Sequence, residues 1–365
     1  MQKISLTRPS SRSLRWGAPV AAAAVLIGVG PAVTALNADA HGSLPPRTAA
    51  QLLVEVQQAK LQSLSGTVVE TSDLGLPALP SVGGHGGDSA SFSSLVSGSH
   101  TMRLWYAGPD RMRVALLGQL GESDLVRNGT DVWAWSSSDN TATHWTVPEQ
   151  AKAPTLAAPE TPMTPQQAAE AALKAIDPST RVSTDPTAEV AGRPAYQLDL
   201  VPRDSHSRIG SVRIAIDGAT HVPTRVQVFA RGASSPALQV GFTSFSTATP
   251  PASTFSFTPP PGATVKQGSA QATPRHSGRA RAEGAAPRVV GKGWTTVVVA
   301  QVGKGAGTKL PEALRALPSV SGAWGSGHVL NGSLFSAVLT DDGRLAVGAV
   351  APRMLYHALA AGGAR

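Results

Sequence analysis

Hydrophobic and polar residues alternate over much of the chain, and this period of two predicts strands that each bury one face. The alternation is clearest from Thr101 to Val147, where Met102, Leu104 and Tyr106 are separated by single residues. An Ala-Gly-Pro-Asp segment at 107–110 then reverses the chain, as turn residues do. The pattern predicts an antiparallel meander whose apolar face needs a cover.

Two segments repeat with a helical period instead, and they are the predicted cover. Thr48 and Gln51 form a capping box for a helix through RTAAQLLVEVQQAKLQSL, residues 47–64, with an apolar stripe that includes Leu52 and Val56. Thr164 begins a second helix, in the segment PQQAAEAALKAID. We expect both helices to lie on the sheet.

A second set of strands is predicted to begin at Ala188 and to end with STFSFTPPPGATV, residues 253–265. The order is then helix, strands, helix, strands, with all strands antiparallel, which is typical of an α+β fold. Between the first strand (64–73) and the meander lies a Gly/Ser-rich loop, 74–99, of the length found in lids or disordered segments.

Composition changes again towards the C-terminus. Residues 268–287 are rich in Gly, Ala, Ser and Arg and predict a flexible basic linker, either a solvated spacer or a segment attracted to anionic lipid headgroups. Residues 288–362 predict a small α+β domain with a strand in GWTTVVVAQV, a short helix in PEALRAL, a hairpin turning at Asp341-Asp342-Gly343 and a closing helix in PRMLYHALA. The chain therefore has a main domain over 47–267 and a second, smaller one.

The N-terminal 40 residues predict export. Basic residues precede an apolar stretch, 18–36, and Ala38-Asp39-Ala40 follows with small residues at the positions of a cleavage site. The segment fits a signal peptide cleaved after Ala40 or an uncleaved membrane anchor, and both place the rest of the chain outside the cytoplasm. The formal charge of +8 is moderate, and basic residues do not cluster around the aromatic ones, so we expect no nucleic acid partner.

No pattern in the sequence predicts catalysis. The chain has no cysteine, and its nine histidines are scattered without metal-ligand spacing. We interpret Gly325-Ser326-Gly327-His328 as a Gly-rich turn because it lacks the G-x-S-x-G elbow of hydrolases, and His144 as an ordinary face residue. We therefore predict a protein that is not an enzyme and holds no cofactor or metal.

Three segments resemble one known family. VRNGTDVWAW (126–135), LWYAGPDRMRV (104–114) and above all TFSFTPPPGATV (254–265) resemble the LolA-type lipoprotein carriers and their relative RseB. The resemblance implies a strongly curved, antiparallel half-barrel with helices on its concave side and an apolar cavity for acyl chains. RseB-like members add a small C-terminal domain and bind an anti-sigma factor. One departure is Gly108, where LolA-type carriers usually have an arginine before the turn proline.

These observations predict an extracytoplasmic monomer that binds lipid or lipoprotein acyl chains. Burial of an acyl chain contributes about 0.8 kcal/mol per methylene, so no polar motif is required. The alternative is an RseB-like regulatory module that binds an anti-sigma factor or another membrane protein through its C-terminal domain. A shift of one residue in register would exchange the two faces of the sheet. From face alternation, the predicted cavity wall consists of Met102, Leu104, Tyr106, Met112, Val114, Leu116, Val132 and Ile214.

Overall fold

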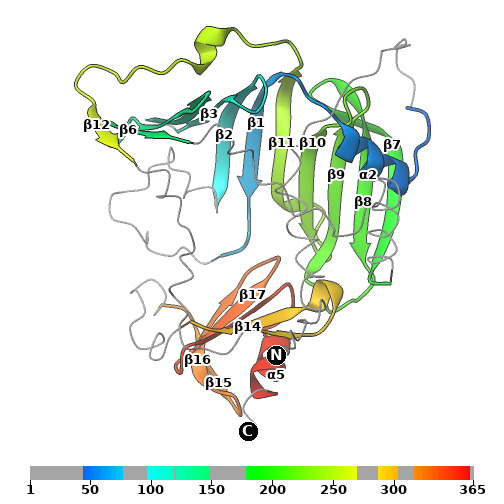
Figure 1. The fold of residues 1–365 in the computed structure, drawn as a ribbon. Coiled ribbons are helices and arrows are strands. Elements are labelled where there is room, and N and C mark those ends of the chain that lie inside the picture. The colour runs from blue at the N-terminus through cyan, green and yellow to red at the C-terminus, as the bar shows by residue number, and fades with distance from the viewer. Residues whose placement is uncertain are drawn as a thin grey trace, which may run out of the picture.

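The protein contains one large curved sheet and one small sheet (Figure 1). The computed structural model describes residues 44–76, 97–118, 121–147, 178–268, 287–302 and 316–361. The predicted N-terminal export segment, the second helix, most of the loop at 74–99 and most of the basic linker lie outside these residues.

The large sheet has twelve strands in the order β12-β6-β5-β4-β3-β2-β1-β11-β10-β9-β8-β7. The strand β1 therefore joins two meanders, which we call the N-terminal wing (β1–β6) and the C-terminal wing (β7–β11). The strands of the large sheet are β1 (Leu64–Ser72), β2 (Gly98–Tyr106), β3 (Arg111–Leu117), β4 (Glu122–Asn128), β5 (Asp131–Ser136), β6 (Thr141–Thr146), β7 (Thr180–Val190), β8 (Arg193–Pro202), β9 (Ile209–Asp217), β10 (Pro223–Ala230), β11 (Pro236–Ser246) and β12 (Thr264–Gln267).

The sheet is open, with β12 and β7 at its two edges, and it is not antiparallel throughout. Every pairing is antiparallel except that of β12, which lies parallel to β6. The prediction of antiparallel strands alone was wrong at this edge. The chain reaches β12 from the far end of β11 by way of residues 247–263, so it enters the edge in the direction of β6.

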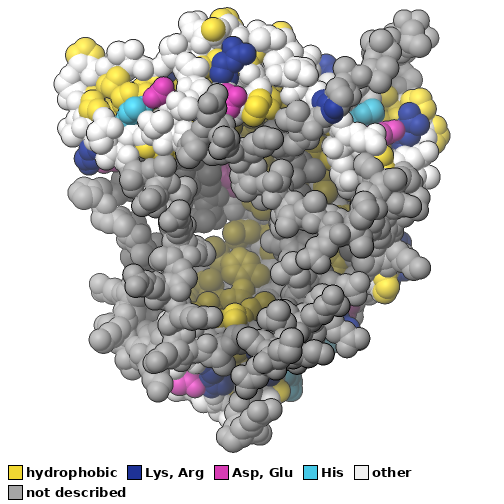
Figure 2. Space-filling model, in the orientation of Figure 1, with side chains coloured by type: hydrophobic (Ala, Val, Ile, Leu, Met, Phe, Trp, Pro, Cys, Tyr) yellow, Lys and Arg dark blue, Asp and Glu magenta, His cyan; other side chains and the backbone are white. Residues whose placement is uncertain are grey.

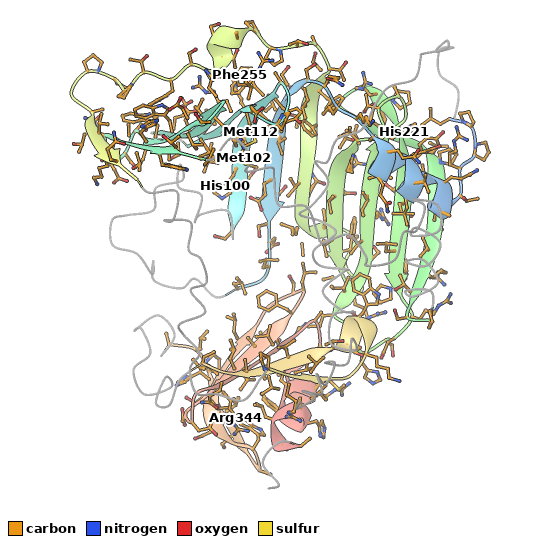
Figure 3. The ribbon with its side chains drawn as sticks, in the orientation of Figure 1. His100, Met102, Met112, His221, Phe255 and Arg344 are labelled. Atoms are coloured by element: carbon orange, nitrogen blue, oxygen red, sulfur yellow. The ribbon has the colours of Figure 1, made fainter. Side chains whose placement is uncertain are left out.

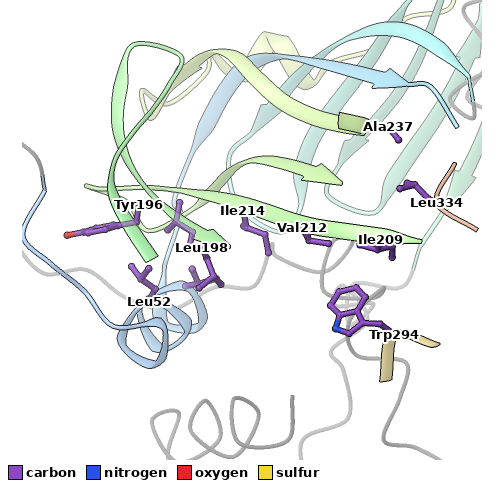
Figure 4. Close-up of a cluster of buried hydrophobic side chains, with 11 residues drawn as sticks. Leu52, Tyr196, Leu198, Ile209, Val212, Ile214, Ala237, Trp294 and Leu334 are labelled. Atoms are coloured by element: carbon purple, nitrogen blue, oxygen red, sulfur yellow. The ribbon is translucent and has the colours of Figure 1, made fainter. Parts of the chain in front are cut away.

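The helix α2 (Ala49–Gln58) confirms the predicted capping box, since Gln51 N–H donates to Thr48 Oγ1 over 3.2 Å and Thr48 N–H donates to Gln51 Oε1 over 2.9 Å. The helix is shorter than predicted, because Ala59 leaves helical geometry at ψ 120°. Its apolar side packs on the C-terminal wing, where Leu52 is fully buried against Tyr196 and Leu198 (Figure 4).

The second strand set begins at Thr180, eight residues before the predicted start at Ala188. The positive φ angles of Ala191 and Gly192 show that Ala188 lies near the end of β7, just before a tight turn into β8. The sequence did not predict β7 as a strand because the segment is polar and contains Pro186. An edge strand tolerates a proline, and the register shifts between Asp185 and Ala188 to accommodate it.

The small sheet has six strands in the order β13-β14-β18-β17-β16-β15, and the helix α5 (Pro352–Ala360) covers one of its faces. Val297, Val338, Leu355 and Leu359 form a core between that face and the helix. The predicted hairpin and closing helix are confirmed. The strands are β13 (Arg288–Val290), β14 (Val297–Gln301), β15 (Ser319–Gly322), β16 (Gly325–Asn331), β17 (Ser336–Thr340) and β18 (Arg344–Gly348).

Two predictions for the small sheet were wrong. GWTTVVVAQV was predicted as one strand, but Gly293–Thr295 form a 3-10 turn, η4, and the strand starts at Val297. Gly325-Ser326-Gly327-His328 was predicted as a turn and instead begins β16. The glycine at 327 serves close strand pairing, since a Cβ there would come within 2.3 Å of the Leu339 carbonyl oxygen.

The two sheets share a core. The turn before β14 inserts Trp294 beneath the C-terminal wing, where its indole N–H donates to Thr180 Oγ1 over 2.7 Å. Leu334, from the loop between β16 and β17, is buried in the same cluster. Backbone hydrogen bonds from Arg208 to Ala349 and from Ser333 to Leu74 close the contact. The C-terminal unit therefore completes the core of the large sheet.

Candidate functional site

The strand pairings place all eight predicted wall residues on one face of the large sheet. In the N-terminal wing, Met102 pairs with Leu116 and Leu104 pairs with Val114. Tyr106 pairs with Met112, which is linked through Arg127 to Val132. We call this the inner face, because continuing the pairings across β1 and β11 leads to Ile214 and Leu198, on which α2 lies.

The structure divides the predicted wall residues into two groups. Tyr106, Leu116, Val132 and Ile214 are buried, with at most 9% of each exposed. The other four remain partly exposed: Met102, Leu104, Met112 and Val114. They lie on the neighbouring strands β2 and β3, and Figure 3 labels both methionines there. Only this second group offers apolar surface to a ligand.

Coverage differs between the two wings. Among the residues that the structure describes, the cluster beneath α2 draws its strand residues from β7–β11 only. Val240 of β11 belongs to the inner face at the junction with β1 and remains 37% exposed. Figure 2 shows hydrophobic side chains at the back of a recess in the middle of the molecule. The inner face is thus covered beneath α2 and buried at Leu64 and Val68 of β1, whereas Val240 beside β1 is exposed.

One acidic residue lies on this apolar face, and sequence reasoning missed it. Glu70 of β1 is flanked by His100 on β2 and Val240 on β11. It is only 4% exposed, and neither carboxylate oxygen has a hydrogen-bond partner within the described ranges. Burial raises the pKa of Glu70, and the nearby His100 opposes that rise. The signal was available, because Glu70 follows Leu64, Gly66 and Val68 at the period-two positions of β1.

The outer face of the N-terminal wing has its own cover. The segment after β11 forms the short 3-10 helix η2 (Ala252–Phe255), whose Phe255 is 1% exposed and lies against β3 and β4. Phe257 follows and packs on Trp133 and Trp135 of β5. The aromatic residues Phe255 and Phe257 of the segment 254–265 therefore pack on the face of the sheet opposite the predicted wall.

Charged pairs on the outer face are structural. The guanidinium of Arg113 binds both carboxylate oxygens of Asp124, over 3.0 and 2.9 Å, and Asp124 is 4% exposed. A cavity of about 330 Å³ opens farther along this face at β1, β2 and β11, where hydroxyl groups surround Arg103 and Trp105. Its lining combines these polar groups with the rings of Trp105 and Phe245.

The serine and histidine considered for catalysis are not paired with each other. Ser326 donates its hydroxyl hydrogen to Asp341, whereas His328 Nδ1 lies 3.1 Å from the Leu317 carbonyl oxygen. His144 stacks on Trp133 and contacts Asp131 over 2.9 Å, so it has a packing role on the outer face. Over the described ranges, no group of three or more histidine or acidic residues could hold a metal ion.

Comparison with solved structures finds two complexes of MucB. The structure of MucB in complex with MucA(peri) is 15% identical over 86% of this chain and 97% of that chain, with a TM-score of 0.41. The Pseudomonas aeruginosa MucA/MucB complex is 16% identical over 85% and 96%, with a TM-score of 0.39. A LolA superfamily protein from Nitrosomonas europaea is 11% identical over 58% and 99%, with a TM-score of 0.20.

The matched structures thus include a LolA superfamily protein, which belongs to the family that three segments of the sequence resemble. No protein-family model matches the chain, and neither does any curated protein. Within the part of the chain that the structure describes, no helix is both long and apolar enough to cross a membrane.

Proposed function

We propose that this protein is an extracytoplasmic binding protein that takes up acyl chains, free or attached to a lipid or lipoprotein, on the inner face of its N-terminal wing. The observation that carries the proposal is the accessible apolar surface of Met102, Leu104, Met112 and Val114, which share one face of two paired strands. The N-terminal segment of residues 1–40 supports the location outside the cytoplasm.

The energetics favour such a ligand. A chain of ten methylenes gains about 8 kcal/mol by leaving water for an apolar surface, before the cost of ordering it is subtracted. The two methionines suit the task because their unbranched side chains adapt to ligands of different shape. Binding of this kind needs no catalytic group, which agrees with the partners found for Ser326 and His328.

The test uses the full exported chain and the neutral fluorescent probe N-phenyl-1-naphthylamine, displaced by dodecanoate. Met102→Lys places an ammonium group on the inner face, and Thr101→Lys places the same group on the outer face of the same strand. We expect Met102→Lys to weaken probe binding about tenfold or more, a change of about 1.4 kcal/mol, and Thr101→Lys to leave it unchanged.

Two results would refute the proposal. One is a wild-type protein that does not bind the probe, and the other is an equal loss in both variants. Organic extraction of the protein purified from its own host adds an independent measurement, in which we expect acyl species to be recovered with the wild type and depleted with Met102→Lys.

A second candidate function rests on the small sheet. On the face opposite α5, one row of paired side chains crosses five strands, and its members Val289 and Val298 are 55% and 41% exposed. The complete row is Val289, Val298, Val347, Ala337 and Leu330. We propose that an apolar segment of a membrane-protein partner, of the anti-sigma-factor type, docks on this row.

Point substitutions test this second candidate better than deletion of residues 288–365, because deletion would remove Trp294 and Leu334 from the core of the large sheet. We expect Val298→Asp to abolish co-purification of a membrane protein from the native host. Val265→Asp is the matched control, since Val265 is 50% exposed on the edge strand β12. Equal recovery of the partner with both variants would contradict the candidate.

A further inference from the structure

Glu70 is placed where a stable fold would favour an apolar side chain. It occupies the inner face of β1 between Val68 and Ser72, and across the neighbouring strands its partners are His100 and Val240. Its side chain is nine-tenths or more buried, and both carboxylate oxygens lack a hydrogen bond to any part of the chain that the structure describes. Burial of an unpartnered carboxyl group costs free energy, so its presence calls for an explanation outside folding.

Two other buried carboxyl groups of the large sheet differ from Glu70, because each is paired with an arginine. Asp217 is 1% exposed, and its two oxygens bind Arg193 over 2.6 and 3.0 Å and also accept hydrogen bonds from Thr220. Asp124 binds Arg113 through both oxygens. Among the described residues, no arginine or lysine binds the Glu70 carboxylate in this way.

The nearest titratable neighbour, His100, acts on Glu70 through its charge and not through a hydrogen bond. Its Nε2 lies 2.8 Å from the Ser97 carbonyl oxygen, which can only accept, so Nε2 carries a hydrogen and donates it to Ser97. On the other side of Glu70 the paired residue is Val240, which is 37% exposed. A ligand on the accessible part of the inner face can therefore reach the immediate surroundings of Glu70.

We propose that Glu70 is the polar anchor of the inner-face site and selects amphiphiles whose apolar chain carries a cationic N–H headgroup, such as a primary ammonium. This inference rests on the proposed function, because the chain of the amphiphile would lie on Met102 and the neighbouring wall residues. The headgroup would donate its hydrogens to the carboxylate oxygens that the free protein leaves unpaired.

The raised pKa of Glu70 agrees with this role. Burial raises its pKa in the free protein, and a bound ammonium group would lower it again by favouring the charged carboxylate. The same ligand therefore relieves the cost of the buried group. An uncharged ligand without a donor would leave that cost in place.

The experiment compares three ligands with the same twelve-carbon chain, below their micellar concentrations at pH 7.5: dodecylammonium, dodecyltrimethylammonium and dodecanoate. Each competes with N-phenyl-1-naphthylamine on the full exported chain. We expect the wild type to bind dodecylammonium about tenfold more tightly than the other two, because only this headgroup combines positive charge with N–H donors.

Glu70→Gln keeps the shape of the side chain and removes its charge, and we expect the preference to fall to within about twofold. The matched control is Glu189→Gln, which changes an exposed carboxyl group in β7 and should keep the full preference. Thermal melting of both variants checks that they are folded.

The outcomes separate this inference from the proposed function. If the wild type binds the neutral probe but all three ligands compete equally, the inner-face site stands and the role of Glu70 is wrong. If Glu70→Gln retains the preference, the anchor lies elsewhere and the inference is again overturned. If the wild type does not bind the probe at all, the proposed function itself fails.

Discussion

The two wings of the large sheet are covered on opposite faces by the segments that the structure describes. In the C-terminal wing the inner face is the core, with Leu52 of α2 seated on Tyr196 and Leu198. In the N-terminal wing the closing segment seals the outer face with Phe255 and Phe257. Strands that alternate in the same way can therefore have different faces committed to packing. On the inner face of β2 and β3, Tyr106 and Leu116 are buried, and the partly exposed residues Met102, Leu104, Met112 and Val114 form the surface that we propose for binding.

The largest expected effect contrasts a packed residue with an accessible one. Phe255→Ala should lower the free energy of unfolding by about 3–5 kcal/mol, because it empties a fully buried site on the outer face. Leu104→Ala, on the accessible inner face of the same wing, should cost about 1 kcal/mol. Urea denaturation of both variants measures the difference. Equal losses would show that the inner face of this wing is as tightly packed as the outer one.

The second-largest expected change in the free energy of unfolding concerns Asp217, a buried carboxyl group in the C-terminal wing that is paired with Arg193. Burial alone would raise the pKa of Asp217, but hydrogen bonds from Arg193 and Thr220 outweigh it and hold the pKa below its usual value. Asp217→Asn should cost about 2–3 kcal/mol at pH 7, less than the loss of a fully buried pair because Arg193 is one-third exposed.

The pH dependence gives this prediction its sign. A carboxyl group with a depressed folded-state pKa stabilises the fold above its unfolded pKa of about 3.9, and this contribution is lost as the pH falls through the folded value. The gap between the wild type and Asp217→Asn should therefore close in acid. Chemical denaturation at pH 7 and at pH 3 measures it, and a gap that is constant with pH would contradict the prediction.

The smallest effect has the opposite sign and lies in the N-terminal wing. Because burial raises the pKa of Glu70, its ionisation destabilises the fold as the pH rises above the unfolded value of about 4.3. Glu70→Gln should therefore stabilise the free protein by about 1 kcal/mol at pH 7.5 and have no effect at pH 4.

Thermal melting at these two pH values provides the measurement. His100 faces Glu70 and opposes the rise of its pKa, so Glu70→Gln also removes this attraction and the expected stabilisation is the net of the two effects. A variant less stable than the wild type at pH 7.5 would show that Glu70 has a structural partner.

Local patterns predicted which residues share the inner face, but they did not predict the contrast between the wings. Period-two alternation correctly grouped Met102, Leu104, Met112 and Val114, because neighbouring positions of a strand must point to opposite faces. Alternation carries no information about which face another segment will cover. It therefore grouped the buried Leu116 and Ile214 with the accessible residues.

The sequence by itself determined the strand alternation, the Thr48–Gln51 capping box and the turns, because each depends on contacts between residues a few positions apart. Only the tertiary structure decided that β1 joins the two wings, that Trp294 and Leu334 complete the core of the large sheet, and that Glu70 lies buried with no hydrogen-bond partner among the described residues. These features depend on pairing between segments far apart in the chain. Their energies arise only when distant strands, loops and side chains meet, so no local pattern records them.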